Sequence, residues 1–238
     1  MNIIKRELRA NLKSLLIWSG VMIFLVYVGM VKYSGFAAAG ETVNEMMQSL
    51  PEALRKMFGL AGLDLTQISA FYGMFYLYFV LLGGIHAVML RATIISKEER
   101  DKTADFLLVK PVIRGKVVTA KLIAALVNVV VLNIVTCLSS IYFVDMFNKG
   151  EPITEEILRL MTALFVIQII FLALGLGISS LTKNTKKATG LSTLILLSMF
   201  ILSIAIDLED KLKPLTFLSP FKYFNANDIL NNKPFKAA

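Results

Sequence analysis

The most informative pattern along the chain is the alternation of long apolar stretches with short charged ones. Five stretches of 18 to 26 residues contain no Asp, Glu, Lys or Arg: residues 14–31, 65–90, 122–144, 160–182 and 188–206. At a rise of 1.5 Å per residue, helices of these lengths can cross a hydrocarbon core about 30 Å thick. A backbone inside lipid must satisfy its own hydrogen bonds, and these stretches lack the short alternating pattern of barrel strands. The pattern therefore predicts an all-α, polytopic membrane bundle with five transmembrane helices, near residues 14–31, 68–93, 120–144, 160–182 and 188–206.

Two further segments have helical periodicity but are amphipathic. Residues 1–13 place apolar side chains every three or four positions, with Lys5, Arg6, Arg9 and Lys13 on the opposite face. This pattern predicts a basic helix lying in the inner membrane interface; a simple basic anchor that sets the topology is the alternative. Residues 41–60 predict two short helices on the outer side, the second capped by Ser49 and beginning near Pro51. This outer segment either packs on the bundle or gates a substrate path.

Composition supports a membrane protein, and the charges orient it. Of the 238 residues, 56% are apolar and 18% are charged, whereas soluble domains have about 45–50% and about 25%. The segments before, between and after the spans alternate in net charge. The basic ones carry +3 (residues 1–13), +4 (91–121) and +3 (183–187). The alternate ones carry −1 (residues 32–64), −2 (145–159) and +1 (207–238). Because cytoplasmic loops are the basic ones, the N-terminus is predicted to be cytoplasmic. We expect one transmembrane domain over residues 1–238 of a bacterial, multi-pass cell-membrane protein, with a cytoplasmic elbow at 94–119 and an outer tail at 207–238.

The same distribution argues against several function classes. The whole excess of +8 lies on the cytoplasmic side, so no basic stripe remains to bind nucleic acid. One cysteine, Cys137, excludes an intrachain disulfide, and with a single histidine it cannot build a zinc site. The chain has no GxxxxGK[ST] phosphate loop, and none of the five stretches carries the Asp or Glu of an aspartyl membrane protease. We therefore predict no enzyme, no metal site and no cofactor.

The few polar residues within the spans have either structural or functional roles. His86 lies near the inner end of the second span, where an ionisable group is a functional hypothesis and a neutral, hydrogen-bonded ring is the structural alternative. Polar side chains of the third span either bridge helices or line a polar path; they are Asn128, Asn133, Thr136, Ser139 and Ser140. Gly83-Gly84 predicts close helix approach or a kink, and Gly175 with Gly177 predicts close approach.

The cytoplasmic elbow is the most distinctive segment. Apolar residues flank a charged turn, Pro111 is predicted to end a helix, and Arg114 marks the start of the next one. The order of side chains resembles the elbow of ABC-2 type permeases, the membrane subunits of a class of ABC transporters. The matching residues are Glu98-Glu99, Arg100, Thr103, Leu107-Leu108, Pro111-Val112-Ile113-Arg114 and Lys121. Leu50-Pro51-Glu52 and the stretch 218–224 also resemble segments of that family, so the likeness covers roughly residues 1–230.

The resemblance implies a permease subunit that moves a substrate outward across the cell membrane. ATP would be hydrolysed by separate cytoplasmic P-loop ATPase subunits, and a second permease copy or relative would complete a homo- or heterodimer in membrane lipid. The family usually has six spans, whereas the charge-free stretches predict five. The implied ATPase-coupling residues are Glu98, Glu99, Arg100, Thr103, Phe106, Leu107, Leu108, Pro111 and Arg114. A non-transporting accessory or immunity-type membrane protein is the alternative, and a membrane enzyme that uses His86 is a third.

Overall fold

The computed structural model describes residues 3–57, 64–100, 114–148, 150, 152–182 and 184–230, with the backbone alone for residues 56, 57, 91–100, 114 and 185. In these ranges there is no strand, and five helices are long and apolar enough to cross a membrane. They are α1 (Ile3–Ala39), α4 (Ile68–Arg100), α6 (Arg114–Phe147), α7 (Thr154–Leu181) and α8 (Thr185–Leu208). The predicted all-α bundle with five spans is confirmed.

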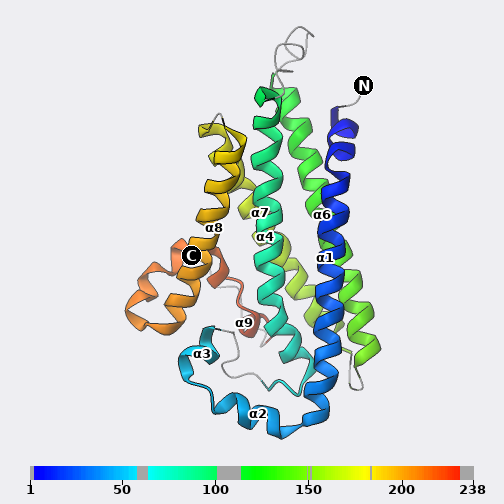
Figure 1. Ribbon diagram of the computed structural model, residues 1–238, viewed down its shortest axis with the longest axis vertical. Helices are drawn as coiled ribbons and strands as arrows, with labels where there is room; N and C mark the ends of the chain where they lie inside the picture. The colour runs from blue at the N-terminus through cyan, green and yellow to red at the C-terminus, as the bar shows by residue number, and fades with distance from the viewer. Residues whose placement is uncertain are drawn as a thin grey trace.

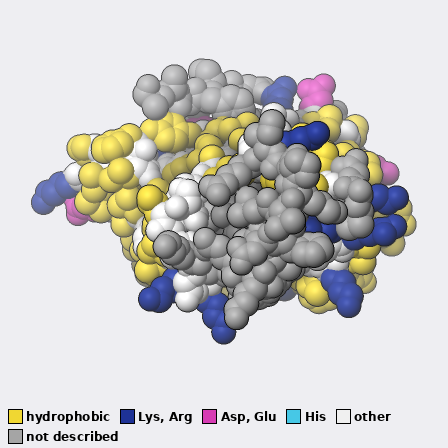
Figure 2. Space-filling view, turned by 90° about the horizontal axis from the view of Figure 1, so that it is seen from above, with side chains coloured by type: hydrophobic (Ala, Val, Ile, Leu, Met, Phe, Trp, Pro, Cys, Tyr) yellow, Lys and Arg dark blue, Asp and Glu magenta, His cyan; other side chains and the backbone are white. Residues whose placement is uncertain are grey.

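The long helices run along one axis of the molecule, with α1 beside α6 and α4 packed against α7 and α8 (Figure 1). The start of α1, the end of α4, the start of α6 and the start of α8 all lie at the same end (Figure 1). Seen from that end, Lys and Arg side chains lie around the rim of the molecule (Figure 2). The fold thus gathers at one end the elements that carry the three basic segments of the sequence.

Helix α4 is the centre of the bundle. In its most apolar window 61% of the residues are buried, compared with 22% for α1 and 17% for α8. A Cβ atom added at Gly83 would lie 2.9 Å from Leu164 Cδ1 of α7, and one at Gly84 would lie 3.1 Å from Leu196 Cδ1 of α8. The two glycines therefore let both neighbours approach α4 closely, as predicted, and α4 remains helical across them.

The amphipathic segments differ in part from expectation. The basic segment is helical from residue 3, as the pattern predicts, and it continues directly into the first span, because α1 is one uninterrupted helix of 37 residues and no Pro or Gly precedes Gly20 to break it. Its location in the membrane interface stays a prediction. Two short outer helices are confirmed as α2 (Glu41–Gln48) and α3 (Glu52–Met57). Ser49 does not cap α3, because it is the C-cap of α2 and α3 begins three residues later, at Glu52; its hydroxyl donates back to Met46 O at 2.7 Å.

The outer tail folds back against the bundle over its described part. It contains the 3₁₀ helices η1 (Asp210–Leu218) and η2 (Pro220–Lys222) and the short helix α9 (Ala226–Leu230). The Ser219 hydroxyl donates to Met199 O of α8 at 2.9 Å. The Phe221 ring lies 5.2 Å from that of Phe171 and 5.4 Å from that of Phe200, between centroids. The segment after α8 is therefore part of the core at the outer end.

The close contact at Gly83 predicts a measurable stability difference. Gly83→Val should destabilise the protein by about 1–3 kcal/mol, because the added methyl groups meet the buried Leu164 side chain. Gly177→Val is the matched control, since a Cβ at Gly177 meets nothing within 4 Å. Thermal unfolding of both variants in detergent micelles measures the difference, and equal midpoints would contradict the close packing.

Candidate functional site

The predicted coupling segment lies between two helices that reach well past a bilayer core. Helices α4 and α6 have 33 and 34 residues, which gives each a length of about 50 Å, against about 30 Å for the hydrocarbon core. Glu98, Glu99 and Arg100 are the last residues of α4, and Arg114 is the first of α6. The other predicted coupling residues lie outside the described residues; they are Thr103, Phe106, Leu107, Leu108 and Pro111. Both helix ends lie at the basic end of the bundle (Figure 1).

A buried lysine lies at the base of this segment. Lys121 is about two helical turns from the start of α6, and it is only 3% exposed. Lys121 takes part in at least one interaction within the protein. Sequence reasoning named Lys121 only as a residue that matches the family elbow. The signal that it is buried was the helical spacing of three and four residues that it shares with Ala124, Ala125, Asn128, Val129 and Leu132, all buried.

Hydrogen bonds between side chains and neighbouring helices tie α4, α6 and α7 together inside the bundle. The Tyr72 hydroxyl of α4 donates to Ser140 Oγ of α6 at 2.7 Å. The Asn133 amide of α6 donates to Met161 O at 3.2 Å and to Gln168 Oε1 at 3.3 Å, both on α7. The helix-bridging interpretation is thus confirmed for Asn133 and Ser140. The remaining three polar residues donate to carbonyls of their own helix, namely Asn128 to Ala124, Thr136 to Leu132 and Ser139 to Thr136.

His86 is buried at 2% exposure and packs edge-on against Trp18 of α1, with 5.6 Å between ring centroids. Neither ring nitrogen has a hydrogen-bond partner among the described residues. Within the same residues, no three His, Cys, Asp or Glu side chains come close enough together to hold a metal ion. This geometry supports a packing role for the imidazole, but the hydrogen bond expected in the structural alternative is not present among the described residues.

A group of hydrogen bonds centred on Asp64, called the Asp64 junction below, lies at the end of the bundle opposite the elbow. The Asp64 Oδ1 atom accepts hydrogen bonds from Thr66 Oγ1 at 2.6 Å, Asn44 Nδ2 at 2.6 Å and Thr66 N at 3.0 Å. The Asn44 side chain also accepts from Leu65 N at 3.2 Å, which ties α2 to the segment before α4. These hydrogen bonds, led by that from the Thr66 hydroxyl, hold the pKa of Asp64 below its ordinary value. Sequence reasoning missed this junction, although Asp64-Leu65-Thr66-Gln67 before a span is typical of an Asx turn.

Comparison with known proteins gives one family. The chain matches the model of the ABC-2 family transporter proteins over residues 1–237. A search of curated proteins gives no match. The match covers the five long helices, the outer helices and the coupling segment together.

Replacing His86 tests whether its ring has more than a packing role. We expect His86→Phe to leave folding intact and thermal stability equal or higher, because an apolar ring of similar shape removes two buried nitrogens without partners. Unfolding in detergent and any transport assay of the same preparation provide the measurement. Loss of transport with unchanged stability would instead assign His86 a functional role.

The Asp64 junction predicts that acid loosens α2. Because hydrogen bonds lower the folded-state pKa of Asp64, its contribution to stability is complete above the ordinary carboxyl pKa of about 3.9 and is lost as the pH falls through the lower folded-state value. Hydrogen exchange of the α2 amides, corrected for intrinsic rates, should rise in acid. Asp64→Asn should show the raised exchange already at pH 7, and a wild-type pattern in that variant would refute this role of the carboxylate.

Proposed function

The chain belongs to the ABC-2 transporter family and is a membrane permease component of an ABC transporter, and we propose that its α4–α6 elbow couples it to separate cytoplasmic ATPase subunits. In this proposal the ATPases bind and hydrolyse ATP, and the permease converts their closure into movement of its helices. The observation that carries the proposal is the pair of long helices that end together at the basic end of the bundle (Figure 1).

The geometry of α4 and α6 suits mechanical coupling. A helix is stiff along its axis, so a displacement of the elbow acts on the whole length of both helices as a rigid-body shift. α4 packs closely on α7 at Gly83, and α6 packs along α1. The bonds from Tyr72 to Ser140 and from Asn133 to α7 join these pairs. Because α4 also packs on α8 at Gly84, a movement that starts at the elbow would reach all five spans.

The docking contacts are proposed from the family resemblance. Glu98, Glu99, Arg100 and Arg114 would provide the polar contacts, and Phe106, Leu107 and Leu108 the apolar ones. The lengths of α4, which ends at Arg100, and of α6, which begins at Arg114, support a location of these helix ends beyond the lipid core. A short segment with charged and large apolar side chains has the composition of an interface in which a few residues dominate binding.

The remaining parts of the proposal concern substrate and assembly. A bundle interior that is mostly apolar favours amphiphilic cargo such as peptides, drugs or lipids over small ions, and outward movement follows the resemblance. α1 and α8 are the least buried spans, so they offer faces for lipid and for a second permease copy or relative.

Affinity purification from gently solubilised membranes tests the coupling. The tagged wild-type chain should co-purify with a P-loop ATPase at about one copy per chain. Glu98→Gln with Glu99→Gln should reduce the recovered ATPase at least tenfold, because bonds to charged groups contribute about 1.5–3 kcal/mol each. Membrane insertion should be unchanged, since the substitution makes the cytoplasmic side more basic.

The first turn of α7 provides the control. Glu155 and Glu156 are a second acidic pair, at the opposite end of the bundle from the elbow. Glu155→Gln with Glu156→Gln removes the same charge and should leave ATPase recovery at the wild-type level. Equal recovery with both double variants would show that the Glu98–Glu99 pair is not the dock. Absence of any ATPase from a folded wild-type chain would favour the non-transporting accessory alternative.

A further inference from the structure

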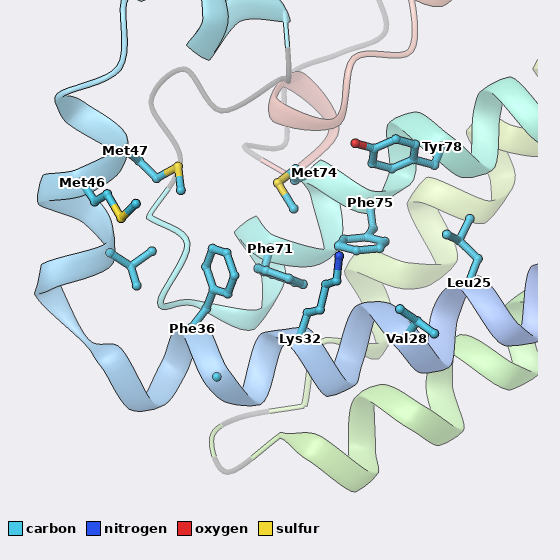
Figure 3. Close-up of a pocket in the computed structure, with 12 residues that line it drawn as sticks. Leu25, Val28, Lys32, Phe36, Met46, Met47, Phe71, Met74, Phe75 and Tyr78 are labelled. Atoms are coloured by element: carbon cyan, nitrogen blue, oxygen red, sulfur yellow. The ribbon is translucent and has the colours of Figure 1, made fainter.

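An open groove lies at the end of the described protein opposite the elbow. It has a volume of about 750 Å³ and lies between α1, α2 and α4, within the range of about 300–1,000 Å³ of ligand pockets. Its walls are apolar or aromatic apart from Lys32 and the hydroxyl of Tyr78. At its floor Phe36 of α1 packs edge-on against Phe71 of α4, with 5.2 Å between ring centroids, and Lys32 lies beside Phe75 (Figure 3). Such a lining suits a hydrocarbon chain with one polar end.

The groove runs along α1 and the first part of α4. On α1 it extends from Leu25 to Phe36, a rise of about 16 Å, and on α4 it spans about two turns, from Phe71 to Tyr78. The charge-free stretch 14–31 ends beside Lys32, so the part of the groove from Lys32 to Leu25, a rise of about 10 Å, lies at the depth of the hydrocarbon core. A hydrocarbon chain in this part would lie at the depth of one leaflet's acyl chains.

Lys32 supplies the charge that selects the polar end of the ligand. Its ammonium group extends from α1 toward the ring of Phe75 (Figure 3). Lys32 is exposed, and it makes no ion pair with any described residue. A cation beside a membrane-depth apolar groove is complementary to an anionic headgroup.

Helix α2 covers the surface end of the groove. Val43, Met46 and Met47 line it from α2, and the bonds between Asn44 and Asp64 hold this helix in place. Met46 is nevertheless 66% exposed, so the cover is partial and the groove stays open toward the surrounding lipid. Methionine side chains adapt to chains of different shape.

We propose that this groove is a binding site for an anionic glycerophospholipid of the leaflet opposite the coupling elbow. One acyl chain lies between α1 and α4 beneath α2, and the lipid phosphate pairs with Lys32. The site binds at equilibrium, so the proposal does not depend on ATP hydrolysis or on the identity of the transported substrate.

Titration of the purified full-length chain with lipid tests the site. The protein in a non-ionic detergent is titrated separately with dioleoylphosphatidylglycerol and dioleoylphosphatidylcholine, and native mass spectrometry counts the bound lipids. The first phosphatidylglycerol should bind about fivefold more tightly than the first phosphatidylcholine, which is the attraction expected from one lysine. Lys32→Gln should remove this preference. Lys13→Gln, at the other end of α1, should keep it.

Variants at two glycines of α1 distinguish lipid binding in the groove from binding elsewhere on the lipid-facing surface. Gly35 lines the groove, whereas Gly20 does not, and a Cβ at either position meets nothing within 4 Å. Both leucine variants should therefore fold, which size-exclusion profiles check. Gly35→Leu should weaken binding of both lipids at least tenfold by filling the groove, and Gly20→Leu should bind as wild type does.

Three outcomes would overturn the proposal. The first is equal affinity of the wild-type chain for the two lipids. The second is lipid binding by Gly35→Leu equal to that of Gly20→Leu. The third is a Gly35→Leu variant that changes the oligomeric state but not lipid binding, which would make the groove a contact between permease copies.

Discussion

The close approach of α7 and α8 to α4 at Gly83 and Gly84 is the constraint on which the rest of the structure depends. Lipid tails are as apolar as leucine, so burying apolar side chains does little to drive the association of membrane helices. Close packing at small residues provides the attraction instead. At Gly83 the neighbouring Leu164 side chain occupies the space that a Cβ would need. This contact fixes α4 at the centre, and α4 in turn sets where the elbow leaves the bundle and where the outer groove opens.

That central position also explains how the two ends of the protein are connected. The same helix carries Glu98 and Glu99 at its elbow end and Phe71 and Phe75 in the groove at its other end. Its contacts with α7 and its bond to α6 through Tyr72 and Ser140 leave little freedom for α4 to move alone. In the proposed coupling, a displacement at the elbow would be carried along α4 to the opposite end, where α9 packs against Gly73, with a Cβ there only 2.7 Å from Leu230 Cδ1.

The five spans could be predicted from the sequence because lipid imposes a simple rule, a charge-free helix of sufficient length. Other features depend on contacts between distant segments, which no local pattern contains. Ser49 has the side chain of an N-cap, but it ends α2, and α3 begins three residues later at Glu52. The ring of Phe221 becomes a core residue only because Phe171 and Phe200 lie beside it. The coupling residues were identified by resemblance alone, whereas the burial of Lys121 could have been predicted from its helical spacing.

Lys32 differs from the other basic residues on its side of the bundle in its local environment. It directly follows the charge-free stretch 14–31 within the uninterrupted helix α1, and it lines an apolar groove. A cation at the edge of the hydrocarbon core is unfavourable unless an anion or water meets it. No acidic side chain among the described residues pairs with it. A lipid phosphate at the surface end of the groove would meet this charge and, through its acyl chain, also cover the apolar wall that α1 and α4 leave open.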